Sequence, residues 1–255
     1  MSYADGKKAV RIGKNVTIDV DKLSIGDGVL IKDNVVIEGP EVSIGDYTVI
    51  GKGVEISGKS ACTIGMSSWL GPDTLIDASG AVEIGNGVGI ASSCQLWTHM
   101  RFGDTLQGCR FDWRKSTRID DDVYIGGNVL LGPIHAARRS AALLGSVVTR
   151  DLAENRVYAG VPAIDVTEKT GPHFEEVPTE EKFRRMLLEL AKFRERDREG
   201  DAIQIVRDWP AKMLPDVSYF NVATREYTKR LTDVEIRFML FLLTPIKFFP
   251  LVVVP

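Results

Sequence analysis

Residues 44–56 read IGDYTVIGKGVEI, and residues 64–76 follow the same pattern as IGMSSWLGPDTLI. In each phrase the first, seventh and thirteenth residues are aliphatic, so an apolar side chain recurs at every sixth position. The same spacing is found in residues 25–37, 84–96 and 119–131. The first four phrases start 19, 20 and 20 residues apart (44−25, 64−44, 84−64), which identifies an internal repeat.

This repeat predicts a solenoid. A Gly, Asn or Asp often follows the aliphatic residue, and these residues tolerate the positive φ of a tight corner. Three short strands and three corners close a triangular coil, and successive coils stack as parallel strands about 4.8 Å apart. An antiparallel sandwich would show a period of two with irregular turn spacing, so the pattern favours a parallel β-helix over residues 1–166.

Three further motifs carry a family resemblance: VYIGG (123–127), GSVVTRD (145–151) and AGVPA (159–163). In this order they resemble the hexapeptide-repeat acyltransferases, specifically the galactoside, maltose, nodulation and xenobiotic O-acetyltransferase branch, over residues 10–166. The resemblance implies a left-handed coil, although parallel crossovers are otherwise right-handed in about 98% of cases. It also implies acetyl-CoA as acyl donor and a homotrimer with active sites between neighbouring prisms.

The six-residue spacing breaks once, in residues 97–118, which predicts a loop leaving the prism. His99 lies at its start, where the resemblance implies a general base, and Asp77 one coil earlier resembles the family's acidic residue that orients it. The alternatives are a surface histidine without a role and an aspartate that only satisfies its own corner. Trp97 and Arg101 beside His99 are expected to contact the acceptor.

The resemblance also implies a coenzyme A site along the prism wall. The residues assigned to it are Tyr124, Gly127, Leu144, Gly145, Thr149 and Arg150. The coil in residues 132–149 departs from the sequence pattern that is usual in the family. Leu144 replaces a small residue, and Arg138 and Arg139 stand where Asp and Gly are usual. These arginines either meet the phosphates of coenzyme A or are solvated on a degenerate coil.

No metal is expected. Gamma-class carbonic anhydrases, built on the same prism, bind zinc through histidines that include an H-x-x-x-x-H pair. Here the residue five after His135 is Ser140, and the remaining histidine, His173, lies beyond the coils.

Residues 167–255 lose the six-residue spacing and form a mainly α-helical C-terminal extension. One amphipathic helix is predicted from Thr179 to before Gly200, and a second from the capping box Thr232-x-x-Glu235 to before Pro245. The segment 216–231 between them is expected to be extended, with Arg225, Tyr227 and Lys229 either lining an acceptor pocket or solvated. The extension is expected to cap the prism, with acceptor choice as a second role.

The composition limits partners and location. The 32 basic and 35 acidic residues nearly cancel, which argues against nucleic acid as a partner. Three widely spaced cysteines and an N-terminus without an apolar core predict a cytoplasmic protein with free thiols. The apolar residues 239–255, interrupted by prolines and a lysine, are expected to pack on the protein, with contact to a membrane surface as the lesser alternative.

The resemblance, with these observations beside it, implies an acetyl-CoA-dependent O-acetyltransferase acting on a sugar hydroxyl in bacterial surface polysaccharide biosynthesis, with a histidine base and direct transfer. An amino-sugar N-acetyltransferase differs only in the acceptor atom. A non-catalytic β-helix scaffold is the alternative from a different class, because the altered coil could have lost coenzyme A.

Overall fold

The computed structural model describes residues 8–251, and contacts divide the chain into two compact units, residues 1–174 and 175–255. The division falls later than the boundary expected at residue 166. The short helix α1 (Thr167–Thr170) belongs to the first unit, where the Thr167 hydroxyl accepts a hydrogen bond from the Val157 N–H at 2.9 Å. The Asn155 amide holds the carbonyl of Phe174 at 3.0 Å, so the chain stays on the coils up to this residue.

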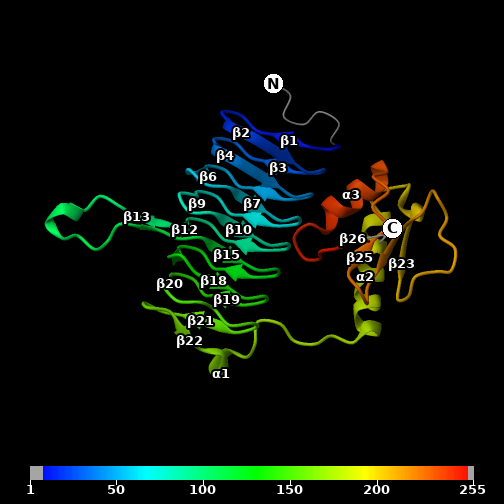
Figure 1. Cartoon of the computed structure of the whole chain (residues 1–255). Coiled ribbons are helices and arrows are strands. Elements are labelled where there is room, and N and C mark those ends of the chain that lie inside the picture. Colours follow the sequence, from blue (N-terminus) through cyan, green and yellow to red (C-terminus); the bar gives the residue numbers. More distant parts are fainter. Residues whose placement is uncertain (1–7, 252–255) are drawn as a thin grey trace. The chain divides into compact units, whose positions relative to one another are not determined.

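Unit 1 is a stack of coils with three ladders of parallel strands (Figure 1). Face 1 consists of β1 (Arg11–Ile12), β3 (Leu30–Ile31), β5 (Val49–Ile50), β8 (Trp69–Leu70), β11 (Gly89–Ile90), β16 (Tyr124–Ile125), β19 (Ala141–Ala142) and β21 (Val157–Ala159), followed by the antiparallel β22 (Ile164–Asp165). The strands β2 (Thr17–Ile25) and β4 (Val36–Ile44) are longer and run through a corner, so each contributes to faces 2 and 3.

Face 2 continues through β6 (Glu55–Ser57), β9 (Leu75–Asp77), β12 (Gln95–Leu96), β17 (Leu130–Leu131) and β20 (Val147–Val148). Face 3 continues through β7 (Cys62–Ile64), β10 (Val82–Ile84), β15 (Thr117–Ile119) and β18 (His135–Ala136). All of these pairings are parallel and in register, so each coil repeats the position of the one before it.

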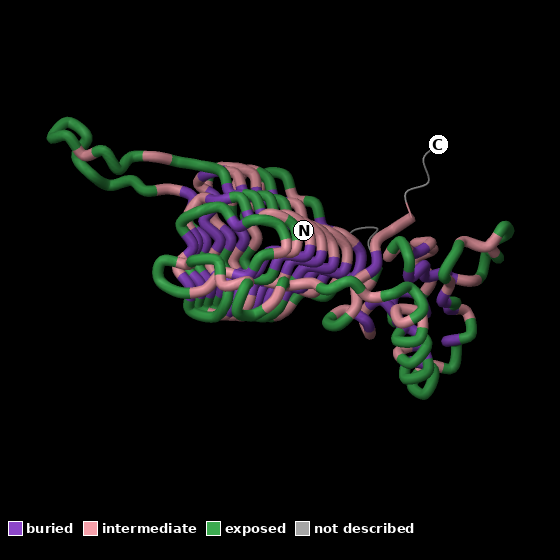
Figure 2. Tube along the Cα trace, turned by 90° about the horizontal axis from the view of Figure 1, so that it is seen from below, coloured by how far each residue is buried: buried purple, intermediate pink, exposed green. Residues whose placement is uncertain are grey.

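The repeated aliphatic residues fill the interior of the coils. Along face 1, for example, they are buried in consecutive coils at Ile31, Ile50, Leu70, Ile90 and Ile125. Figure 2 shows the buried positions on the inner side of the stacked turns. The predicted fold class, an all-β solenoid of hexapeptide repeats with a mainly α-helical C-terminal extension, is confirmed, and the extension also contains a four-stranded sheet.

The corners use the left-handed backbone region, as the sequence predicts, although the residues there are more varied than Gly, Asn and Asp. Asn34 (φ 60°), Asp73 (φ 57°) and Asn128 (φ 56°) fit the expectation. Tyr47 (φ 56°) and Arg139 (φ 59°) also adopt this conformation. Since a bulky residue is strained there, contacts elsewhere in the coil must hold these two corners in place.

The break in the repeat is an antiparallel hairpin. Strands β13 (His99–Met100) and β14 (Trp113–Arg114) pair, and a 3-10 turn (Thr105–Gln107) lies near the tip. The coil resumes at Thr117 rather than after residue 118, because residues 117–119 form the face 3 strand β15. We call residues 97–116 the arm; it projects from the stack between faces 2 and 3 (Figure 1).

Unit 2 contains the two predicted helices and a sheet. Helix α2 (Thr179–Arg194) ends before Gly200, which opens a 3-10 turn (Gly200–Ala202), and α3 (Asp233–Leu242) begins where the Thr232 hydroxyl accepts from the Glu235 N–H. The sheet has the order β23 (Ile203–Val206), β24 (Ser218–Asn221), β25 (Glu226–Tyr227), β26 (Phe249–Pro250). The expected extended segment supplies β24 and β25; β23 and β26 are too short to show a period in the sequence.

Aromatic side chains form the core of unit 2. Phe220 stacks on Tyr227 at 5.4 Å between ring centroids and meets Phe238 edge-on at 5.0 Å. Tyr227 is fully buried, so it does not line an open acceptor pocket. Met239, Leu242 and Phe248 are buried as well, which supports packing of the apolar C-terminal stretch on the protein as far as residue 251. No helix within residues 8–251 has the length and apolarity needed to cross a bilayer.

The close stacking of coils predicts a large effect at Gly58. A Cβ added there would lie 2.1 Å from the backbone carbon of Ala78 in the next coil, whereas one added at Gly132 would meet only the Val148 carbonyl oxygen at 3.8 Å. Gly58→Ala should therefore lower the free energy of unfolding by about 1–3 kcal/mol or more, as overpacking does, and Gly132→Ala by less. Urea unfolding followed by circular dichroism measures both; equal effects would contradict this account of the coil spacing.

Candidate active site

The corner between faces 2 and 3 joins Asp77 to His99. Asp77 ends β9, and His99 begins the arm one coil later. The Asp77 Oδ2 atom lies 2.7 Å from His99 Nδ1, and the Asp77 side chain is buried while that of His99 is one-third exposed. A carboxylate on Nδ1 favours the tautomer with the proton on that nitrogen, which leaves Nε2 as a proton acceptor.

Thr98 fixes this pair to the coil. Its backbone N–H donates to Asp77 Oδ2 at 2.8 Å, and its hydroxyl lies 2.8 Å from the Asp77 carbonyl oxygen and accepts from the Gly80 N–H at 2.8 Å. Burial by itself raises the pKa of Asp77, but hydrogen bonds from Ser79, His99 and Thr98 outweigh it and lower the pKa to about 2. Asp77 is therefore a carboxylate at neutral pH, already held in position for the histidine.

His99 lines two clefts of about 550 Å³ each, one against either side of the arm. The first, which we call the apolar cleft, lies between the arm and the later coils of face 2; its walls include Trp97, Met100, Trp113, Leu130 and Val147. The second, which we call the charged cleft, is lined by Lys59, Ser79, Arg101, Asp112 and Arg114. Both volumes fall within the range of roughly 300–1,000 Å³ of small-molecule sites.

The two residues predicted to contact the acceptor, Trp97 and Arg101, lie in different clefts. Trp97 lies in the apolar cleft, where its ring centroid is 6.3 Å from that of His99 and its Nε1 donates to Gln95 Oε1 at 3.1 Å. Arg101 lies in the charged cleft, 3.5 Å from the Asp112 carboxylate. His99 is the residue that the two clefts share.

The residues predicted to hold coenzyme A do not form one cluster within a single chain. Thr149 lines the apolar cleft together with His99. Tyr124 is on face 1, and Gly127 lies at the corner between faces 1 and 2, where a Cβ added to it would lie 3.3 Å from the Leu144 side chain. Leu144 is 73% exposed at that corner, beside Gly145 (φ 70°), and Arg150 follows β20 in an exposed position.

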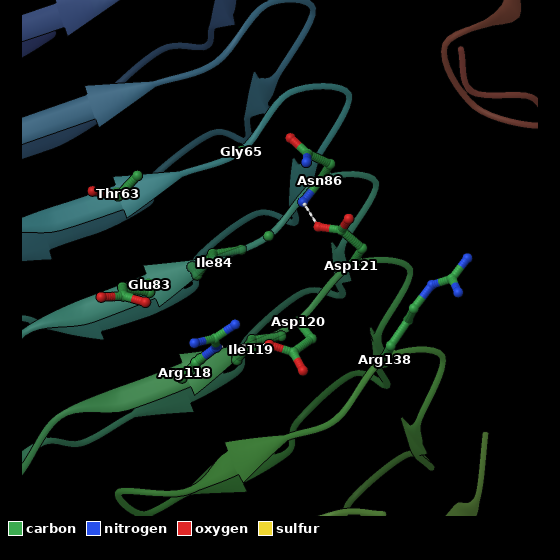
Figure 3. Close-up of a pocket in the computed structure, with 11 residues that line it drawn as sticks. Thr63, Gly65, Glu83, Ile84, Asn86, Arg118, Ile119, Asp120, Asp121 and Arg138 are labelled. Atoms are coloured by element: carbon green, nitrogen blue, oxygen red, sulfur yellow. Dashed lines mark hydrogen bonds and ion pairs between the residues drawn. The ribbon is translucent and has the colours of Figure 1, made fainter. Parts of the chain in front are cut away.

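The altered coil has a packing role in unit 1. The Arg139 guanidinium lies 5.1 Å from the Phe174 ring centroid, and the Arg139 carbonyl accepts from His173 Nδ1 at 2.9 Å. The His173 ring in turn lies 6.2 Å from that of Tyr124. Arg139 and Tyr124 therefore support the segment that returns along the coils. Arg138 instead reaches a groove at the corner between faces 3 and 1 (Figure 3).

A second histidine–carboxylate pair lies on face 3. His135 Nε2 is 2.9 Å from Asp120 Oδ2, and Arg118 Nε is 2.8 Å from Asp120 Oδ1. Burial raises the pKa of Asp120, but the hydrogen bonds from Arg118 and His135 outweigh it and lower the pKa. This pair is separate from the clefts at His99. Among residues 8–251 no group of three or more His, Cys, Asp or Glu side chains is placed to hold a metal ion.

Several site residues have no sequence signal of their own. Thr98 stands next to the histidine, but its contacts with Asp77 require the coil stacking to be known. Lys59 lies two coils before His99, and Trp113 and Arg114 reach the site through the pairing of β14 with β13. The hairpin register could not be read from the six-residue spacing, because the arm does not follow it.

The chain is similar to one curated protein and to several solved structures. No family model matches the chain. The bifunctional protein GlmU of Nitrosomonas europaea is 34% identical over 116 residues, which are 38% of this chain and 25% of GlmU, so the chain spans about a quarter of the length of this curated relative. A variant of AntD, an N-acyltransferase from Bacillus cereus, has a TM-score of 0.44 at 20% identity, covering 72% of this chain and 91% of that one.

A maltose O-acetyltransferase from Clostridium difficile 630 has a TM-score of 0.35 at 20% identity, covering 66% of this chain and 72% of that one. Both solved structures are acyltransferases by name. By its own fold and site, the chain is a hexapeptide-repeat β-helix protein with a histidine–aspartate pair at the base of an arm.

The lowered pKa of Asp77 predicts a pH-dependent contribution to stability. Since the folded-state pKa is about 2 against an ordinary 3.8, the contribution is fully present above pH 4 and is lost as the pH falls towards 2. Asp77→Asn should lower the free energy of unfolding near pH 6 by on the order of 2 kcal/mol, the scale of a hydrogen bond to a charged group.

Urea unfolding at intervals between pH 2 and pH 6 measures this difference, which should shrink as the solution becomes more acidic. Asp112→Asn removes an exposed carboxylate from the arm and is the matched control, with little effect on stability. A difference for Asp77→Asn that stays constant with pH would contradict the assigned hydrogen bonds.

Proposed function

We propose that this protein is an acetyl-CoA-dependent acetyltransferase that modifies a saccharide, with His99 as the general base. The observation that carries the proposal is the His99–Asp77 hydrogen bond of 2.7 Å at a point lined by two separate clefts. A base between two clefts suits a reaction in which donor and acceptor approach from different sides.

The proposed reaction is a direct transfer. The acceptor hydroxyl loses its proton to His99 Nε2 while its oxygen bonds to the thioester carbonyl carbon; the carbon–sulfur bond then breaks, and the imidazolium returns the proton to the sulfur of coenzyme A. Asp77, kept ionised by its hydrogen bonds, stabilises the imidazolium during the transfer. No covalent enzyme intermediate is needed.

The apolar cleft is proposed as the donor side. Its aromatic and aliphatic walls suit the pantetheine arm, and Thr149 adds a hydroxyl there. Of the remaining predicted residues, Tyr124 lies on face 1, Gly127, Leu144 and Gly145 lie at the corner between faces 1 and 2, and Arg150 follows the face 2 strand β20. They would meet the donor through a neighbouring subunit, in keeping with the trimeric arrangement that the family resemblance implies.

The acceptor class is proposed from the family. AntD is in complex with coenzyme A and dTDP-4-amino-4,6-dideoxyglucose, a nucleotide sugar, and another similar structure is a maltose O-acetyltransferase. We propose transfer to a sugar hydroxyl within bacterial surface polysaccharide biosynthesis in the cytoplasm. Transfer to an amino group of a sugar uses the same base and the same clefts.

His99→Ala should reduce acetyl transfer by about 10²- to 10⁴-fold, the usual contribution of a general base, while coenzyme A binding is retained. Thiol release from acetyl-CoA against a panel of sugars gives the rate, and calorimetry gives the binding. His135→Ala is the matched control because it removes the other histidine of a histidine–carboxylate pair, and it should leave the rate unchanged. If the wild-type protein did not bind acetyl-CoA, the result would contradict the proposed function and favour the alternative of a non-catalytic β-helix scaffold.

The proposed homotrimer predicts a role for the tip of the arm. Phe102 is fully exposed, and Leu106 and Phe111 are 90% and 60% exposed, an arrangement that favours burial against another chain. Phe102→Glu should weaken the trimer, measured by light scattering after size-exclusion chromatography, with Arg110→Glu as a control on the same loop. A wild-type protein that is monomeric at all concentrations would contradict the proposed assembly.

A further inference from the structure

The two sides of the arm differ in chemistry because of strand alternation. In the antiparallel pair, His99 lies opposite Arg114, and Met100 lies opposite Trp113. Opposed residues share one side of a hairpin, and neighbours along a strand alternate between sides. The His99 side therefore carries Arg114 and, one alternation further along each strand, Arg101 and Asp112, all of which line the charged cleft.

The prism adds a cation and a hydroxyl to this cleft. Lys59 and Ser79 occupy the corner between faces 2 and 3 in two successive coils, where the Ser60 N–H donates to the Ala78 carbonyl at 2.9 Å. The next coil continues into the arm at His99. The charged cleft is thus built from a rigid stack on one side and the hairpin on the other.

The lining charges of this cleft do not cancel. Three cations, Lys59, Arg101 and Arg114, face one carboxylate, that of Asp112, which leaves a net charge of +2 (3−1). Asp112 pairs with Arg101 at 3.5 Å, and no carboxylate of residues 8–251 pairs with Lys59 or Arg114. This net positive charge is not a general feature of the hollows on the prism.

Two other hollows of the prism provide a comparison. The groove in Figure 3 is lined by Arg118 and Arg138 against Glu83, Asp120 and Asp121, a net charge of −1 (2−3). In the apolar cleft the charged lining residue besides His99 is Lys115, whose Nζ lies 5.6 Å from the Trp113 ring centroid. The charged cleft therefore has the largest positive surplus of the three hollows, +2 against +1 in the apolar cleft and −1 in the groove of Figure 3.

We infer that the acceptor bears an anionic group, a phosphate or a carboxylate, which Lys59 and Arg114 hold in the charged cleft while a hydroxyl of the same molecule reaches His99. Lys supplies a compact charge and Arg a planar fork of donors, and both recognise phosphate and carboxylate oxygens through charge-assisted hydrogen bonds. Ser79 contributes a neutral donor in the same wall. This inference rests on the proposed function for the position of the reacting hydroxyl, but the anion site itself does not depend on turnover.

Three probes with related sugar rings distinguish the sources of the anion: glucose 1-phosphate, glucuronate and neutral methyl glucoside. Binding of each to the full-length protein is measured by calorimetry without acetyl-CoA, and acetyl transfer to each is measured separately. The double variant Lys59→Gln/Arg114→Gln removes the two cations without a carboxylate partner. Lys32→Gln/Lys52→Gln is the matched control, since both lysines are exposed at the corner between faces 1 and 2.

The inference predicts that one anionic probe binds at least about tenfold more tightly than methyl glucoside, the scale of one charge-assisted hydrogen bond. This preference should be lost in the cleft double variant, kept in the control variant, and weakened by added salt. Preference for glucose 1-phosphate assigns a phosphate, and preference for glucuronate assigns a carboxylate. Circular dichroism of the double variant should match the wild type, because both side chains are exposed.

Equal binding of all three probes, or an anion preference that survives in the double variant, would overturn the inference. If coenzyme A binding and His99-dependent transfer to methyl glucoside are then still observed, the proposed function stands without it. If the anion preference is present and depends on Lys59 and Arg114 while no acetyl transfer occurs, the anion site is supported and the proposed function fails.

Discussion

Each coil of unit 1 must return an aliphatic side chain to the interior three times, and every other feature of that unit depends on this requirement. The ladders of buried residues such as Ile50, Leu70 and Ile90 leave no space for an insertion along a strand. Extra residues can be added at a corner, where the chain leaves the interior. The corner between faces 2 and 3 is where the arm emerges, so the packing of the coils determines where the candidate active site is placed.

Asp77 links the rigid coils to the arm. It ends a strand of the prism, accepts hydrogen bonds from both the backbone and the hydroxyl of Thr98, and contacts the ring of His99. The carboxylate keeps its charge because these donors outweigh the effect of burial on its pKa. A partly exposed histidine at the base of a loop thereby acquires the tautomer and orientation that suit a general base.

The arm separates two environments around one imidazole. Strand alternation directs Met100 and Trp113 to the apolar cleft and Arg101 and Arg114 to the charged cleft. The coil in residues 132–149 keeps the register of the repeat although its sequence has changed. Arg139 occupies a left-handed corner position there, and its guanidinium packs on the Phe174 ring, so the changed residue supports the segment that ends unit 1.

The fold of unit 1 was predictable from the sequence alone because a six-residue period of aliphatic residues has few other physical solutions, and the two helices of unit 2 followed from their period and from the capping box at Thr232. The predicted positions of His99 and Asp77 followed from the break in that period and from the family resemblance. The sequence did not indicate that Lys59, Thr98 and Arg114 meet at the same site, since they are distant or irregularly spaced along the chain. Only the tertiary structure brings these three residues together, through the stacking of the coils and the register of the hairpin. Both are set by backbone hydrogen bonds, which do not require a particular side chain and therefore leave no periodic pattern in the sequence of the arm.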